Sequence, residues 1–221
     1  AVCRELGLAL AGGHSIDAPE PIFGLAVNGL VDLKHLKLNK GAEPGDLLFL
    51  TKPLGVGMLT TAEKQGLLEV GHQGLARETM LVSNRIGSAL ARIEGVHAMT
   101  DVTGFGLAGH LSEVCAASGV AARIDFRRLP RLAEAEAYRR QGAVPGGTRR
   151  NRDALGASLP AMDETHWQWL CDPQTSGGLL ISVHPSWEDD VERVGREHGI
   201  ELAPFGEVVK AEGEALIEVR G

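Results

Sequence analysis

The chain has 221 residues, of which 43% are hydrophobic, and its 29 acidic residues outnumber 22 basic ones, giving a formal net charge of -7. Its length allows one large domain, or one domain with part of another. The negative charge disfavours non-specific binding to nucleic acid, and the apolar runs are far shorter than the roughly 20 residues that span a bilayer. We therefore expect a globular, cytoplasmic protein with neither a membrane nor a nucleic acid as partner.

The cysteines and histidines are those expected of a globular, cytoplasmic protein. Cys3, Cys115 and Cys171 are widely separated and form no Cys-x-x-Cys pair, which predicts reduced thiols rather than a disulfide framework. The eight histidines show no spacing typical of metal ligands, so we expect no structural zinc site. The chain starts at Ala1 in what reads as a helix already under way, and we expect it to be a truncated chain.

The first elements cannot enclose a core by themselves. Residues 1–11 have apolar residues at helical spacing, and two glycines follow as a stop signal. A polar loop over residues 14–21 leads into residues 22–31, which are rich enough in strand formers to predict a strand. One helix and one or two strands bury too little surface for a free-standing domain. We therefore divide the chain into residues 1–39, the remnant of one domain, and residues 40–221, a second domain.

The second domain begins with alternating strands and helices. We predict a strand over residues 47–51, a helix within residues 75–93, and strands over residues 96–100 and 120–126 on either side of another helix. This order predicts a layered α/β (α+β) fold with ligands beyond the carboxyl ends of strands. The glycines in residues 52–57 either bring backbone close to a ligand or form a plain strand-to-helix turn.

The remaining elements are shorter. We predict helices over residues 133–140 and 163–170, a strand over residues 179–183, one more helix, and a closing hairpin formed by residues 205–210 and 215–219. Residues 142–152 read as a loop in which Arg149 and Arg150 stand among glycines. Paired guanidinium groups could hold a phosphate there, and a solvated basic loop is the alternative.

The most informative stretch is TDVTGFGLAGH, residues 100–110. A short apolar strand ends in an acid, and glycines then open a helix, whose free N–H groups suit an anion such as phosphate. A carboxylate next to phosphate is favourable when a Mg²⁺ ion lies between them, so Asp101 is a candidate metal ligand. The alternative is that Asp101 and Thr103 only cap the helix.

Three stretches in this order resemble signatures of the selenophosphate synthetase (selenide, water dikinase) family: GGHSIDAPEP at residues 12–21, TDVTGFGLAGH at residues 100–110, and CDPQTSGGLL at residues 171–180. The resemblance implies an ATP-dependent phosphotransferase that converts selenide, ATP and water to selenophosphate, AMP and phosphate for selenocysteine and selenouridine synthesis. It implies a C-terminal domain similar to that of aminoimidazole ribonucleotide synthetase, preceded by a remnant of an N-terminal domain.

The resemblance also implies site residues and partners. Gly13, His14 and Ser15 would contact ATP across a homodimer, so that the subunits share the nucleotide site, and Asp101 would bind Mg²⁺. The family's reactive Cys or selenocysteine and its Lys precede the segment matched by this chain, and no residue here is assigned as catalytic. Cys171 is rejected as a nucleophile because no basic partner lies near it in sequence.

We therefore expect this polypeptide alone to be inactive. One alternative is a non-catalytic fragment that acts as a dimerisation or nucleotide-binding half. The other is a sister ATP-dependent synthetase or kinase of the same fold.

Overall fold

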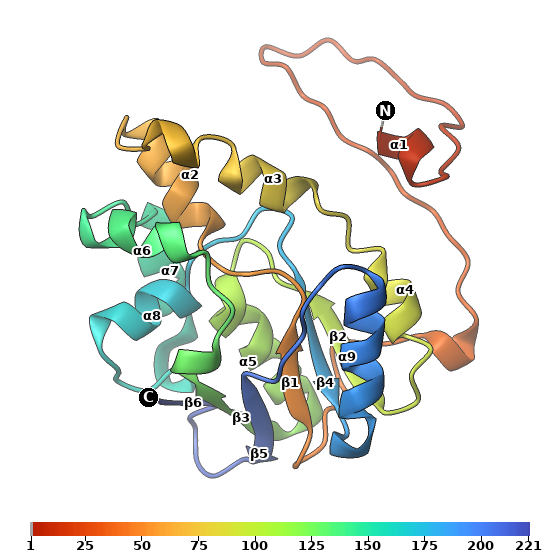
Figure 1. Ribbon diagram of the computed structural model, residues 1–221, viewed down its shortest axis with the longest axis vertical. Helices are drawn as coiled ribbons and strands as arrows, with labels where there is room; N and C mark the ends of the chain where they lie inside the picture. Colours follow the sequence, from red (N-terminus) through yellow and green to blue (C-terminus); the bar gives the residue numbers. More distant parts are fainter. Residues whose placement is uncertain (1) are drawn as a thin grey trace. The chain divides into compact units, whose positions relative to one another are not determined.

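The computed structural model describes residues 2–221, which separate into two units, one ending at Asp32 and one running from Leu33 to Gly221 (Figure 1). Each unit is described by itself. In the described part of the chain, none of the helices combines the length and the apolar character needed to cross a bilayer. The domain boundary that we place at residue 39 stays a prediction.

The first unit has little regular structure. Within residues 2–32 it contains one helix, α1 (Val2–Glu5), so the helix predicted over residues 1–11 is wrong beyond its first turn. The strand predicted over residues 22–31 is also wrong, because these residues have no strand hydrogen bonding in the structure. Phe23 and Val27 are 89% and 79% exposed. A strand needs a neighbouring strand edge, and residues 2–32 supply none.

The second unit is built on one mixed sheet. Among the described residues, its strands are β1 (Leu47–Leu50), β2 (Val96–Asp101), β3 (Val120–Asp125), β4 (Leu179–Val183), β5 (Gly206–Lys210) and β6 (Ile217–Arg220). They lie in the order β2-β4-β1-β5-β3-β6. Neighbouring strands are antiparallel except β3 and β6, which are parallel. Strand β4 therefore separates β1 from β2.

Alternating side chains bury both faces of this sheet. Leu48 and Leu50 of β1 belong to one core cluster, whereas Phe49 belongs to the other. This is the two-residue period of a strand that is covered on both sides. The first face packs against α5 (Gly106–Ser118), and the second packs against α4 (Ile86–Leu90) and α9 (Glu188–Glu197), which lie side by side in Figure 1. The layered α/β prediction is confirmed.

The other helices surround the α5 side or connect the layers. They are α2 (Val56–Lys64), α3 (Leu75–Leu81), α6 (Ala133–Arg140), α7 (Gly146–Leu155) and α8 (Glu164–Leu170). Short 3-10 turns occupy Leu33–His35, Val70–His72, Phe126–Arg128, Gly156–Ser158 and Pro185–Trp187. The helical stripe over residues 75–93 is divided between α3 and α4, because Val82 after α3 has an extended backbone with φ -61° and ψ 120°.

Two further predictions are wrong. Residues 142–152, predicted as a loop, contain most of α7, which begins after Pro145. The closing hairpin does not form, because β5 and β6 pair with opposite edges of β3. Arg123 of β3 forms ion pairs with Glu207 at 2.7 Å and Glu218 at 2.8 Å, so the charge pattern favours a central position for β3.

Candidate functional site

Three loops meet at one end of the sheet, where β1 and β2 end and β4 begins. The Val102 N–H donates to the Gly178 carbonyl at 2.8 Å, and the Gln174 N–H donates to the Thr103 carbonyl at 3.0 Å. On the β1 side, the Thr51 N–H donates to the Leu179 carbonyl at 3.0 Å. The structure therefore brings together the stretches at residues 100–110 and 171–180 and the turn that follows β1.

Close backbone contacts explain glycines in two of these loops. A Cβ atom on Gly177 would overlap the Val102 carbonyl oxygen. Gly106 has φ +70°, and a Cβ atom there would lie 2.8 Å from the Leu170 carbonyl oxygen. Any larger residue would push the loops apart at both positions. These glycines are therefore required by the protein's own backbone, whether or not a ligand binds.

A buried carboxylate joins the 171–178 loop to the start of α2. Asp172 is 0% exposed, and its Oδ2 accepts hydrogen bonds from the Gly57 N–H at 3.1 Å and from Gln174 Nε2 at 2.7 Å. Its Oδ1 has no partner. Burial raises the pKa of Asp172 to about 7, while the hydrogen bonds from Gln174 and from the α2 backbone oppose this shift. Asp172 takes the place of a local capping side chain, because the N-cap residue of α2 is a glycine.

That role could not be predicted from the sequence, because Asp172 and α2 are more than 100 residues apart. For residues 52–57 we considered a plain strand-to-helix turn and a turn whose backbone approaches a ligand. The structure decides only the first of these points. These residues form a strand-to-helix turn in which the Gly57 N–H already binds Asp172. Contact of this turn with a nucleotide stays a prediction.

Lys52 lies at the end of β1 and is only 4% exposed. Its Nζ donates to the Ser176 carbonyl at 2.6 Å, and burial lowers the pKa of its ammonium group. Ser176 itself has φ +49°, which is unusual for a residue with a side chain. Lys52 thus holds the tip of the 171–178 loop at Ser176, whereas Asp172 joins the start of the same loop to α2.

Asp101, in contrast, is exposed at the end of β2. Its carboxylate takes part in no hydrogen bond or ion pair with the residues that the structure describes, and its charge raises the pKa of His110 against the larger lowering that burial causes. The capping alternative is wrong: α5 has Phe105 as its N-cap residue with no side-chain cap, and the Thr103 hydroxyl pairs with His110 Nε2 at 3.1 Å. The Asp101 carboxylate is therefore exposed to solvent, and its role as a metal ligand stays a prediction.

The donors around Asp101 fit only part of a Mg²⁺ site. Mg²⁺ takes six oxygen ligands and usually keeps several waters. Among residues 2–221, no three His, Cys, Asp or Glu side chains are grouped so that they could hold a metal ion. Asp101 can therefore act as one ligand, but the described His, Cys, Asp and Glu side chains form no set of three around a metal ion.

The nucleotide-loop residues lie in the other unit. Gly13, His14 and Ser15 are exposed and have no regular secondary structure. A Cβ atom on Gly13 would meet nothing within 4 Å, so packing in this unit does not require a glycine there. Their role in binding ATP stays a prediction.

Two of the cysteines are unsuited to nucleophilic chemistry. Cys115 and Cys171 are both 0% exposed, and burial raises the pKa of each thiol to about 12. A thiol with so high a pKa carries almost no thiolate at neutral pH. The structure thus supports the rejection of Cys171 as a nucleophile.

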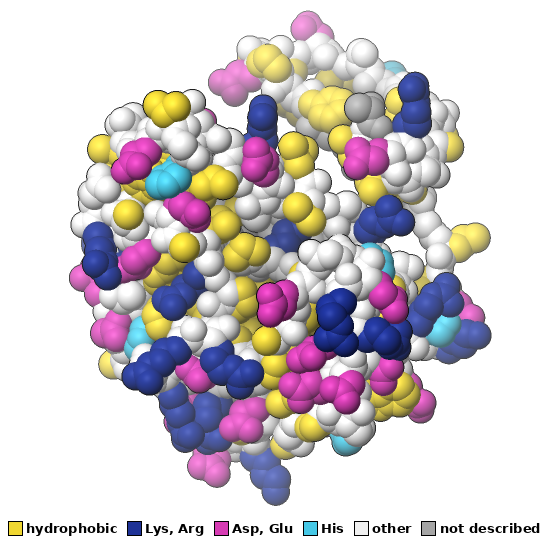
Figure 2. Space-filling model, in the orientation of Figure 1, with side chains coloured by type: hydrophobic (Ala, Val, Ile, Leu, Met, Phe, Trp, Pro, Cys, Tyr) yellow, Lys and Arg dark blue, Asp and Glu magenta, His cyan; other side chains and the backbone are white. Residues whose placement is uncertain are grey.

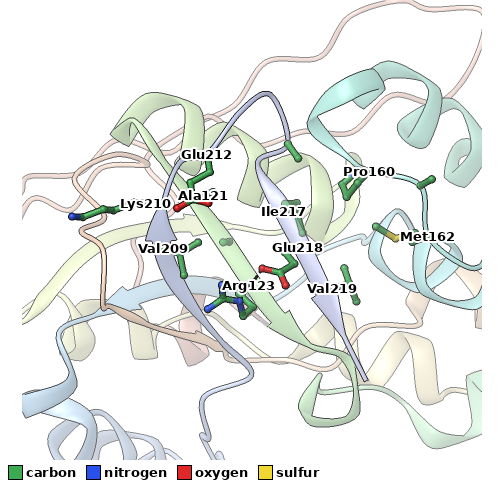
Figure 3. Close-up of a pocket in the computed structure, with 13 residues that line it drawn as sticks. Ala121, Arg123, Pro160, Met162, Val209, Lys210, Glu212, Ile217, Glu218 and Val219 are labelled. Atoms are coloured by element: carbon green, nitrogen blue, oxygen red, sulfur yellow. Dashed lines mark hydrogen bonds and ion pairs between the residues drawn. The ribbon is translucent and has the colours of Figure 1, made fainter.

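A cavity of about 520 Å³ lies away from these loops, between β3, β5, β6 and residues 160–162 (Figure 3). Strand β6 is the edge of the sheet opposite β2, which carries Asp101. The charged groups at this cavity include Arg123 and Glu218, which are already paired with each other. Figure 2 shows acidic and basic side chains interspersed over the face in view, so the surface there has no single sign of charge.

Comparisons with known proteins agree with this architecture. The chain belongs to the family described as AIR synthase related protein, C-terminal domain, whose model matches residues 43–218. Within that fold, solved structures include thiamine-monophosphate kinase from Stenotrophomonas maltophilia, with a TM-score of 0.61 at 18% identity, covering 86% of this chain and 55% of that one. Hydrogenase maturation protein HypE in complex with ATP has a TM-score of 0.57 at 21% identity, covering 83% and 50%.

Comparison with curated proteins identifies relatives of much higher sequence identity than these solved structures. The chain is 56% identical to selenide, water dikinase of Photorhabdus laumondii over 220 residues, which are 99% of this chain and 63% of that protein. The Escherichia coli K12 selenide, water dikinase is 56% identical over 219 residues, with the same coverage. The resemblance to selenophosphate synthetases is confirmed. The chain spans slightly less than two thirds of the length of these relatives.

Proposed function

We propose that this chain provides the AIR synthase-type domain of a selenide, water dikinase, which uses ATP and water to convert selenide to selenophosphate, AMP and phosphate. The observation that carries the proposal is the 56% identity over 99% of the chain. The meeting of the 100–110 and 171–180 stretches at one end of the sheet supports it, because both carry the family resemblance. The sister-kinase alternative has only fold-level likeness, at 18–21% identity.

We assign Asp101 as the Mg²⁺ ligand that this domain contributes, and Gly13, His14 and Ser15 as contacts to ATP in a site shared by two subunits of a homodimer. A bound Mg²⁺ ion would neutralise charge on the phosphates, which is the main requirement of phosphoryl transfer. Support comes from the exposed carboxylate of Asp101 and the exposure of the three loop residues. Asp101 ends β2 and pairs with Leu179, directly after the 171–178 loop that Lys52 and Asp172 hold in place.

We further propose that activity needs groups beyond these residues, including a reactive Cys or selenocysteine and a Lys, in a cytoplasmic enzyme. The low thiolate content of Cys115 and Cys171 supports this, since neither can supply the reactive group.

The test compares two proteins. One is the chain as given; the other is a restored protein, in which the region of the P. laumondii relative that this chain does not cover is joined to it. We expect selenide-dependent release of AMP from ATP only from the restored protein, and we expect Asp101→Asn to lower that rate about 100-fold or more. AMP release by the restored protein without selenide would instead indicate another ATP-dependent reaction, and full activity of Asp101→Asn would overturn its assignment as a ligand.

A further inference from the structure

Helix α7 contains a side chain that bridges the two motif loops. Asn151 lies on its second turn and is half-buried. Its Nδ2 donates to the Gly104 carbonyl at 2.8 Å and to the Cys171 carbonyl at 3.0 Å. One amide group thus uses both of its hydrogens on backbone oxygens that are 67 residues apart in sequence.

The chemistry at this position requires a donor. Both partners are carbonyl oxygens, which only accept, so the side chain must present an NH₂ group and not its oxygen. A carboxylate of the same shape has only acceptor oxygens and would repel both carbonyls. Without Asn151, the two carbonyls lose their common partner.

The Gly104–Phe105 turn needs such a contact more than its neighbours do. Residues 102 and 103 are tied directly to the 171–178 loop by backbone hydrogen bonds, and Gly106 packs on Leu170 and Cys171. A Cβ atom on Gly104, however, would meet nothing within 4 Å, and Phe105 is 65% exposed. Asn151 therefore supplies a side-chain contact from another helix that holds this exposed turn.

We propose that Asn151 is a positioning residue that fixes the Gly104–Phe105 turn beside Asp101. The inference rests on the proposed function for its catalytic consequence, and on the two hydrogen bonds alone for its structural part. It also gives a role to the Gly-Gly-Thr-Arg-Arg-Asn stretch at residues 146–151: the helix presents its asparagine to the loops.

The first experiment measures amide hydrogen exchange in the chain as given. Asn151→Asp keeps the side-chain shape and removes both donors, so we expect exchange over residues 103–106 to become about tenfold faster, while exchange in β4 stays unchanged. Asn39→Ala is the matched control, because Asn39 makes one exposed hydrogen bond to Glu113, at 2.9 Å, outside these loops. Unchanged exchange in Asn151→Asp would overturn the bridge.

The second experiment uses the restored protein and follows AMP release. We expect Asn151→Asp and Asn151→Ala to lower kcat about tenfold, with less than about a threefold change in KM for ATP, because a displaced turn impairs the transition state more than ground-state binding. Equal loss of activity in Asn39→Ala, or wild-type kcat in Asn151→Asp, would overturn the positioning role. Failure of the wild-type restored protein to release AMP would overturn the proposed function, whereas the exchange result would still decide whether the bridge exists.

Discussion

Gly106 and Gly104 belong to the same motif, yet their surroundings are opposite. Gly106 has a left-handed backbone and is pressed against the backbone of Leu170 and Cys171, whereas Gly104 borders open space. Gly106 is required by the fold, because a residue with a side chain does not fit there. Packing gives no such reason for a glycine at position 104. This glycine-rich motif thus mixes a position that the backbone packing requires with a position that the packing leaves open.

Substitution of a glycine that is crowded by backbone, such as Gly106 or Gly177, should cause the largest loss of stability. We expect Gly177→Ala to lower the free energy of unfolding by about 3 kcal/mol or more, because the new methyl group overlaps the Val102 carbonyl and must separate two loops. Urea denaturation followed by circular dichroism measures this loss. A loss below about 1 kcal/mol would show that the loops can part easily.

Substitution of Asp172 should change the free energy of unfolding by a smaller amount, and that amount should depend on pH. Its pKa is about 7 in the folded protein and about 4 in an unfolded chain, so the folded protein retains a proton that the unfolded chain has released between these values. The stability contributed by that proton is complete below about pH 4 and is lost as the pH rises to about 7.

We therefore expect Asp172→Asn to remove this fall, so that the variant gains stability relative to the wild type as the pH rises from 4 to 8. Urea unfolding at several pH values measures the difference. A constant difference between the two proteins would contradict the raised pKa. Glu113→Gln, at an exposed carboxylate on α5, is the control for general effects of charge removal.

Substitution of the open glycine, Gly104, should cause the smallest change in stability. We expect Gly104→Ala to alter the free energy of unfolding by less than about 0.5 kcal/mol, because its Cβ meets no protein atom. In the restored protein, however, we expect it to lower kcat for AMP release several-fold, with less than about a threefold change in KM for ATP, because the added methyl group disturbs the same turn that Asn151 holds. Loss of stability comparable to that of Gly177→Ala would remove the distinction between the two classes.

Much of the second unit could be predicted from the sequence, because its strands have strong apolar patterns and its loops contain clear turn residues. Strands β1, β2, β3 and β4 lie within one residue of their predicted bounds. The hairpin prediction failed because strand pairing depends on which edge of β3 is free, and short-range pattern does not contain that information. Helix α7 was missed because its side chains are mostly polar and its three glycine or proline residues at the start resemble a loop.

The candidate site could be predicted only as separate stretches. The carboxylate of Asp101 was identified at the end of a strand because the apolar run before it stops there. The anchoring roles of Lys52, Asp172 and Asn151 depend on contacts between residues far apart in sequence, which a single sequence does not show. The first unit was predicted least well, since its apolar residues have no partner within residues 2–32.

The position of β4 in the sheet has a consequence for how the chain folds. Leu47 of β1 pairs with Val183, and Asp101 of β2 pairs with Leu179, so the strand between β1 and β2 is one that the ribosome makes long after both. Contacts of such large sequence separation slow folding. During synthesis, two apolar strand edges must wait for residues 179–183, and this interval is when the nascent chain is most exposed to aggregation and most dependent on chaperones.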